Sequence, residues 1–122
     1  MEPVKVARLV GAGRAAIGLG MLVAPRLAVG TWIGAPADTV GTQTVVRAFG
    51  ARELLLGFLQ SHVAAQPGVG RRTFAALSLC DLVDASVTIA GRKHLPASGV
   101  ALVGVMAAAG GVSQLSLSRK LP

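Results

Sequence analysis

Apolar residues fill four long runs of this chain, separated by prolines, glycines and charged residues. The runs cover about residues 4–24, 39–65, 73–90 and 96–117. A helix needs roughly 20 mostly apolar residues to cross the hydrocarbon core of a bilayer, and the runs are close to that length. The segments between them are short, so consecutive helices should be antiparallel neighbours. The pattern predicts an all-α fold, a four-transmembrane-helix bundle, as a single integral membrane domain over residues 1–122.

Capping and helix-breaking residues mark the expected ends of these spans. The first run stops at Pro25, and a loop rich in breakers should follow it, with Trp32 at the level of the lipid head groups. Asp38 is the expected N-cap of the second span. Pro96 suits the first turn of the fourth span.

The shortage of charge supports lipid as the surrounding solvent. Hydrophobic residues make up 52% of the chain and charged residues only 14%, whereas an ordinary soluble domain carries roughly a quarter charged residues. No charged residue falls between Pro96 and Val112, so that helix has no polar face to turn to water. This argues against the main alternative, a soluble bundle with an apolar core.

The net charge of +7 lies at the ends of the apolar runs. The basic clusters are Lys5 with Arg8, Arg71 with Arg72, Arg92 with Lys93, and Arg119 with Lys120. They form no stripe with interleaved aromatic residues, so a nucleic-acid partner is not expected. Clusters beside apolar spans orient membrane proteins and contact anionic head groups. Their bias predicts a multi-pass protein of the cell membrane with both termini in the cytoplasm.

Six ionisable residues fall well inside the spans. They are Arg14, Arg47, Arg52, Glu53, Asp81 and Asp84. A charge at the bilayer centre costs a few kcal/mol or more, so such residues usually face the bundle interior and pair. Because three cations match three anions, a charge-neutral buried network is expected.

Helical spacing, at about 100° per residue, assigns these charges to faces. One face of the first helix holds Ala7, Gly11, Arg14, Gly18 and Met21. One face of the second holds Gln43, Arg47, Gly50, Glu53, Gly57 and Ser61. Asp81, Asp84 and Thr88 form a stripe on the third. Arg52 points away from its helix's polar face, towards lipid or a second protomer, so a homodimer or larger membrane complex is an expected assembly.

The stripes predict specific partners and candidate site residues. Glu53 should meet Arg14, and Arg47 or Arg52 should meet Asp81 or Asp84, because the second and third helices are expected neighbours. A carboxyl left incompletely paired would act as an acid, with Glu53 and Asp84 the first candidates and Asp81 the third. The candidate binding residues are Arg14, Arg47, Arg52 and Trp32.

Metal and cofactor chemistry finds no support in the sequence. Cys80 is the only cysteine, which excludes an internal disulfide. His62 and His94 are far apart along the chain, so no metal site is expected. Gly11-Ala-Gly13 lacks the third glycine and the preceding strand of a dinucleotide-binding loop. No cofactor is expected.

Three segments resemble an uncharacterised family of small four-helix membrane proteins common in actinobacteria, a domain of unknown function. They are the arginine-glycine first helix ending in Leu22-Val23-Ala24-Pro25, the segment Arg47-Ala-Phe-Gly-Ala-Arg-Glu53 with Leu56-Gly57, and Asp81-Leu-Val-Asp84. The first helix is also loosely similar to DoxX-like proteins. The resemblance implies a four-helix topology over nearly the whole chain and supplies no substrate.

Three functional classes fit these features, and whether the chain is an enzyme stays open. The preferred one is a structural or accessory membrane component with a charge-paired core. The alternative is an intramembrane cyclase or isomerase that acts on a lipophilic substrate through Glu53 or Asp84 as general acid. A small proton-coupled exporter is disfavoured, because Arg14 stands in the first helix and aromatic residues total 3%. A cavity that reaches Glu53 or Asp84 would favour the lipophilic substrate.

Overall fold

The computed structural model describes residues 2–122, and this part of the chain is helical and contains no strand. The four long helices are α1 (Pro3–Val23), α3 (Val40–Val63), α4 (Val69–Ala90) and α5 (Ala97–Ser118). The connections contain a short helix, α2 (Pro25–Ile33), and two 3-10 turns, η1 (Ala35–Asp38) and η2 (Arg92–His94). The all-α prediction is confirmed.

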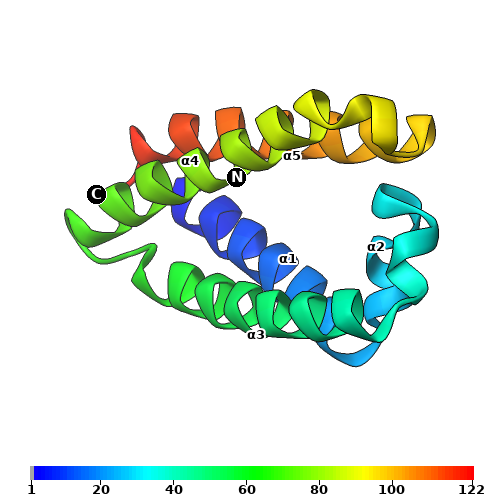
Figure 1. Cartoon of the computed structure of the whole chain (residues 1–122). Helices are drawn as coiled ribbons and strands as arrows, with labels where there is room; N and C mark the ends of the chain where they lie inside the picture. Colours follow the sequence, from blue (N-terminus) through cyan, green and yellow to red (C-terminus); the bar gives the residue numbers. More distant parts are fainter. Residues whose placement is uncertain (1) are drawn as a thin grey trace.

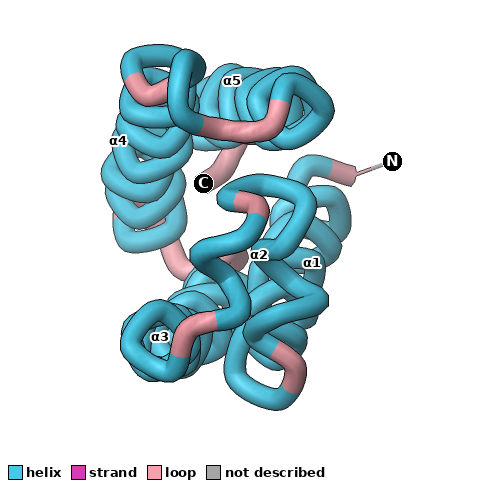
Figure 2. The backbone as a smooth tube through the Cα atoms, turned by 45° about the vertical axis from the view of Figure 1, so that its right-hand side comes forward, coloured by secondary structure: helices cyan, strands magenta, loops and turns pink. Residues whose placement is uncertain are grey.

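The long helices form two antiparallel pairs rather than one evenly packed bundle (Figure 1). Helix α1 packs along α3, and α4 packs along α5, while few contacts join one pair to the other. Figure 2 shows the pairs on opposite sides, with α2 between them. The expectation that α3 and α4 are close neighbours is therefore wrong. The small-residue face of α3 packs against α1, so little of the surface of α3 is available to contact α4.

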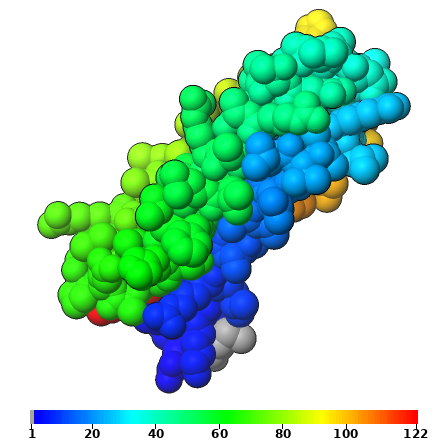
Figure 3. Space-filling model, turned by 90° about the horizontal axis from the view of Figure 1, so that it is seen from below, coloured from blue at the N-terminus to red at the C-terminus, as the bar shows by residue number. Residues whose placement is uncertain are grey.

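Glycines bring the backbones of α1 and α3 into direct contact. Gly11 opposes Gly57, and Gly18 opposes Gly50. A Cβ atom added to Gly11 would lie 2.7 Å from the carbonyl oxygen of Gly57, and one added to Gly50 would lie 2.7 Å from that of Gly18. Figure 3 shows the face on which the two helices lie side by side. Small residues at helix contacts are typical of packing in lipid.

The buried face of α1 is the one that the sequence predicts. Its buried residues are Ala7, Gly11, Arg14, Gly18 and Met21. The prediction for α3 is confirmed in part, because Gly50 and Gly57 are buried whereas Arg47 is exposed.

Burial in this protein differs from burial in a soluble domain, because several polar side chains are buried while many large apolar ones are exposed. The largest fully buried side chains are Phe74, Gln60, Gln114, Thr88 and Ser78. Large apolar side chains instead cover the outside of all four long helices, including Leu9, Phe58, Val83 and Val105. Soluble proteins seldom expose continuous apolar surfaces of this kind. The outer surface matches hydrocarbon, and the interior combines polar and small residues with a few large apolar side chains such as Phe74 and Leu117.

Three of the helices, α1, α4 and α5, are long and apolar enough to cross a membrane. This is consistent with an integral membrane protein. Helix α3, the remaining expected span, has 24 residues. It carries the charged residues Arg47, Arg52 and Glu53, and by its composition it is not among the helices apolar enough to cross a membrane.

The segment after Pro25 is a helix and not the expected loop. Proline is favoured at the first helical position, where its missing N–H costs no hydrogen bond, and Pro25 takes this position in α2. The helix ends at Gly34, whose φ of +74° favours glycine. Trp32 therefore lies on a helix, where its indole donates a hydrogen bond to Thr88 on α4.

Two helix starts also differ from the sequence-based boundaries. The N-cap of α3 is Thr39, whose hydroxyl accepts a hydrogen bond from the Thr42 amide at 3.3 Å. Asp38 ends η1 instead, and its carboxylate pairs with Arg26 at 2.6 Å. Helix α4 begins at Val69, four residues before the expected start, because its first turn is polar and lies outside the apolar run.

Candidate functional site

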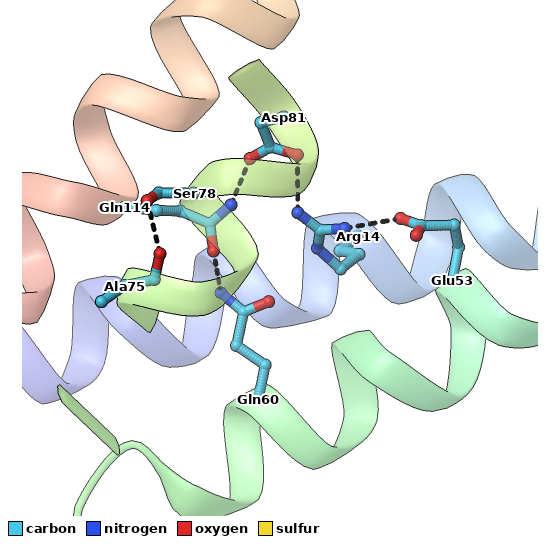
Figure 4. Close-up of polar contacts among 7 residues, drawn as sticks. All are labelled: Arg14, Glu53, Gln60, Ala75, Ser78, Asp81 and Gln114. Atoms are coloured by element: carbon cyan, nitrogen blue, oxygen red, sulfur yellow. Dashed lines mark hydrogen bonds and ion pairs between the residues drawn. The ribbon is translucent and has the colours of Figure 1, made fainter. Parts of the chain in front are cut away.

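One arginine joins the two helix pairs near the middle of the molecule (Figure 4). The Arg14 side chain on α1 is only 8% exposed. Its Nη1 donates to Oε2 of Glu53 on α3 at 2.8 Å, and its Nη2 donates to Oδ1 of Asp81 on α4 at 2.7 Å. Such charge-assisted hydrogen bonds are roughly twice as strong as neutral ones. Arg14 therefore ties α1 both to its own partner helix and to the other pair.

Two buried glutamines extend this network to α5. The Gln114 side-chain amide donates to Oδ2 of Asp81, and its Oε1 accepts from Nε2 of Gln60 on α3 at 2.7 Å. The Oε1 atom of Gln60 is buried and has no hydrogen-bond partner among residues 2–122. The polar network thus runs through all four long helices. Neither glutamine is among the site residues predicted from the sequence, although amide side chains inside apolar spans often form hydrogen bonds between membrane helices.

The two glutamines should contribute unequally to stability. Gln114→Leu removes a hydrogen bond to a carboxylate and is expected to lower the free energy of unfolding by about 1.5–3 kcal/mol. Gln60→Leu removes a neutral hydrogen bond and leaves only Oε1 of Gln114 without its donor, so its expected cost is lower, about 1 kcal/mol. Unfolding titrations of both variants in detergent micelles measure the difference. Equal costs would mean that the hydrogen bond from Gln114 to Asp81 adds nothing to the stability of the protein.

The expected pairing of Glu53 with Arg14 is present, whereas the one expected for Asp81 and Asp84 is wrong. Arg47 is exposed, and its Nε donates to the carbonyl oxygen of Leu22 at 3.3 Å. Arg52 is exposed and has no ion-pair partner within residues 2–122. Both arginines fail to reach α4 because α3 packs on α1. The interior consequently holds one arginine and three carboxyl groups.

A cavity of about 460 Å³ lies between the two helix pairs. Its polar lining residues are Arg14, Glu53, Asp81, Asp84 and Gln114. Its apolar lining includes Ile17, Trp32, Phe49, Leu102, Val103 and Met106. The size lies in the ordinary range of small-molecule sites, roughly 300–1,000 Å³, which are also mostly apolar with a few polar groups.

The cavity opens along the seam between α1 and α5. These two helices make few contacts with each other. Ile17 on α1 and Leu102 and Met106 on α5 line the cavity, and each is about half exposed on the outer surface. The mouth is therefore apolar, like the surface around it.

Asp84 is the carboxyl group in the cavity without a partner. It lies one helical turn from Asp81, and no side chain among residues 2–122 donates a hydrogen bond to it. The next residue of the stripe is Thr88, whose hydroxyl accepts a hydrogen bond from the indole N–H of Trp32 at 3.1 Å. Glu53 and Asp81 are held as hydrogen-bond acceptors by Arg14. Of the three carboxyls, Asp84 is the one that accepts no hydrogen bond from residues 2–122 through either oxygen.

The structure brings together five of the seven residues singled out by the sequence. Arg14, Glu53, Asp81, Asp84 and Trp32 all line the cavity, whereas Arg47 and Arg52 lie outside it. Cys80 is free and exposed. In residues 2–122, no three His, Cys, Asp or Glu side chains are grouped to hold a metal ion.

The fold and the site together describe a helical protein, consistent with a membrane protein, that has a polar network and a cavity between two pairs of helices. No family model matches the chain, and no curated protein or solved structure does. The functional argument therefore rests on the site itself.

Proposed function

We propose that this protein is a four-span integral membrane protein that binds a lipophilic small molecule in the cavity between its helix pairs. The observation that carries the proposal is the combination of a cavity of about 460 Å³, apolar walls, and a mouth between α1 and α5 at the apolar outer surface. A molecule dissolved in the hydrocarbon layer reaches such a mouth without crossing water. Preformed apolar pockets with a few polar groups are the usual sites for such ligands.

The length and outer face of α3 support its role as the fourth span. Its 24 residues extend about 36 Å at 1.5 Å per residue, enough to cross the bilayer core. Leu55, Phe58 and Leu59 are exposed on its outside. Glu53 is paired with Arg14, which leaves Arg47 and Arg52 as the arginines of α3 without an ion-pair partner among residues 2–122, and Arg52 is the one nearer the middle of the helix. Its long side chain suits a head group or a second protein, in line with an accessory role in a larger membrane complex.

The distribution of basic residues supports a multi-pass orientation with both termini in the cytoplasm. Arg71, Arg72 and Arg119 line a hollow of about 400 Å³ at the end where α4 begins and α5 finishes. Fewer basic residues lie in the connections at the opposite ends of the helices. Cytoplasmic loops of membrane proteins carry such an excess of Lys and Arg.

Structural and ligand-binding roles fall to different residues of the same site. Arg14, Glu53 and Asp81 are mutually bound and hold the helix pairs together. Asp84 faces the cavity with both oxygens free of protein donors. A general-acid role, if the bound molecule is converted, therefore belongs to Asp84 and not to Glu53.

Photolabelling in lipid vesicles tests the proposed cavity. A neutral long-chain alcohol with a terminal diazirine should label Ile17, Leu102 and Met106 above the other outward residues, because the probe is held there. Met106→Trp should fill the cavity and reduce this labelling to the level of the surrounding surface. Val105→Trp is the matched control, since Val105 is exposed on the same helix and does not line the cavity. Uniform labelling of all outward residues would contradict the proposal.

A further inference from the structure

The charges around the cavity do not cancel. Four ionisable side chains line it, namely Arg14, Glu53, Asp81 and Asp84. Arg14 shares its single positive charge between two carboxylates, with N–O distances of 2.8 and 2.7 Å, and no cation of residues 2–122 lies within ion-pair distance of Asp84. With all four groups ionised, one positive charge faces three negative charges. No other Lys, Arg or His side chain of residues 2–122 lines the cavity.

An uncompensated negative charge between membrane helices is costly, and it has two ways of being neutralised. A buried carboxylate that lacks a counter-charge loses several kcal/mol of hydration. Either a proton or a positively charged ligand removes that cost. The apolar remainder of the cavity adds a second requirement, because only a ligand with a large apolar part fills the space towards Leu102 and Met106.

We propose that the cavity selects a lipophilic amine, whose positively charged nitrogen lies against Asp84 and whose apolar part extends to the mouth between α1 and α5. This rests on the proposed function, and it adds the chemical class of the ligand. Asp84 supplies the counter-ion. A neutral head group would leave that carboxylate uncompensated, and an anionic one would be repelled by it.

The aromatic lining supports the same class of ligand. Trp32 and Phe49 both line the cavity. The hydrogen bond from the Trp32 indole to Thr88 fixes this ring one helical turn beyond Asp84. Aromatic faces attract ammonium groups by about 0.5–2 kcal/mol, most strongly where water is excluded. A carboxylate and two aromatic rings in the lining of one cavity suit a substituted ammonium group.

Three photoreactive probes with the same decyl chain and different head groups test the inference. The heads are trimethylammonium, hydroxyl and carboxylate, and the full chain is placed in phosphatidylcholine vesicles so that lipid charge does not bias the result. Probe concentrations are expressed per lipid, which corrects for partitioning. The ammonium probe is expected to label the cavity at a concentration at least about tenfold lower than the hydroxyl probe, and the carboxylate probe should label least.

Two variants separate the contribution of Asp84 from a general effect of charge. Asp84→Asn should remove the preference for ammonium over hydroxyl, and it should fold, since Asp84 has no hydrogen-bond partner to lose. Asp38→Asn makes the same chemical change on the exposed surface and should keep the preference. Thermal unfolding of both variants verifies the fold.

The possible outcomes distinguish this inference from the proposed function. Equal labelling by the ammonium and hydroxyl probes would overturn the amine proposal, with a proton left as the neutralising group, while cavity binding itself would stand. Absence of cavity labelling by every probe would overturn the proposed function as well. A preference that survives in Asp84→Asn would reject Asp84 as the counter-ion.

Discussion

Arg14→Leu is expected to lower the free energy of unfolding by about 3 kcal/mol, because it leaves two partly buried carboxylates without their cation. Among residues 2–122, Arg14 is the only side chain that binds both Glu53 and Asp81. Its loss also removes a link between the α1–α3 pair and the α4–α5 pair, which make few other contacts. Stability is measured by titrating folded protein in mild detergent with sodium dodecyl sulfate.

A matched triple variant distinguishes a charge effect from a simple loss of packing. Arg14→Leu combined with Glu53→Gln and Asp81→Asn removes the two carboxylates that Arg14 binds, so it creates no new unpaired charge and should regain most of the lost stability. Replacement of a buried ionic group by uncharged residues of similar volume is often neutral or stabilising. If the triple variant is as unstable as Arg14→Leu alone, ion pairing is not what Arg14 contributes.

Gly57→Ala is expected to destabilise the protein by about 1–3 kcal/mol, the usual cost of overpacking. A Cβ atom at this position would lie 2.5 Å from the carbonyl oxygen of Gly11. The obstructing atom is backbone, so it cannot rotate away, and α1 and α3 would have to separate. The same titration in detergent measures the loss.

Gly20→Ala is the control for this substitution, because a Cβ atom there meets nothing within 4 Å. Alanine favours a helix interior over glycine by about 1 kcal/mol, so Gly20→Ala should be neutral or slightly stabilising. Similar losses for Gly20→Ala and Gly57→Ala would mean that helix propensity, and not the close contact, decides the effect.

Features that depend on the spacing within one helix could be predicted from the sequence. The buried face of α1 follows from helical periodicity, since small residues at positions 7, 11 and 18 surround Arg14. The match between Arg14 and Glu53 follows because both lie near mid-depth on the glycine faces of helices that pack together. Glycines seven residues apart on each helix, Gly11 and Gly18 on one and Gly50 and Gly57 on the other, form the contact surface between α1 and α3.

Features that depend on which helices meet could not be predicted. Three cations and three anions do lie within the expected spans. Their charges would cancel in the interior only if all six side chains faced the space between the helices. Arg47 and Arg52 lie outside because glycine contacts commit α3 to α1. The bond between Gln60 and Gln114 joins residues 54 positions apart, and no local pattern encodes it. Helix α2 is not predicted by the sequence pattern, because Pro25 and Gly30 both commonly interrupt helices. Proline is nevertheless well suited to the first position of a helix, which Pro25 takes here.

The glycine contacts of α1 and α3 have a mechanical consequence. Backbone meets backbone along that surface, so we expect α1 and α3 to move together as one rigid unit. Any change of shape in the protein should then occur where helices make few contacts. Few contacts join α1 to α5, and residues of both helices line the cavity. We therefore expect movement of the two helix pairs relative to each other to change the width of the cavity, while the contact between α1 and α3 stays intact.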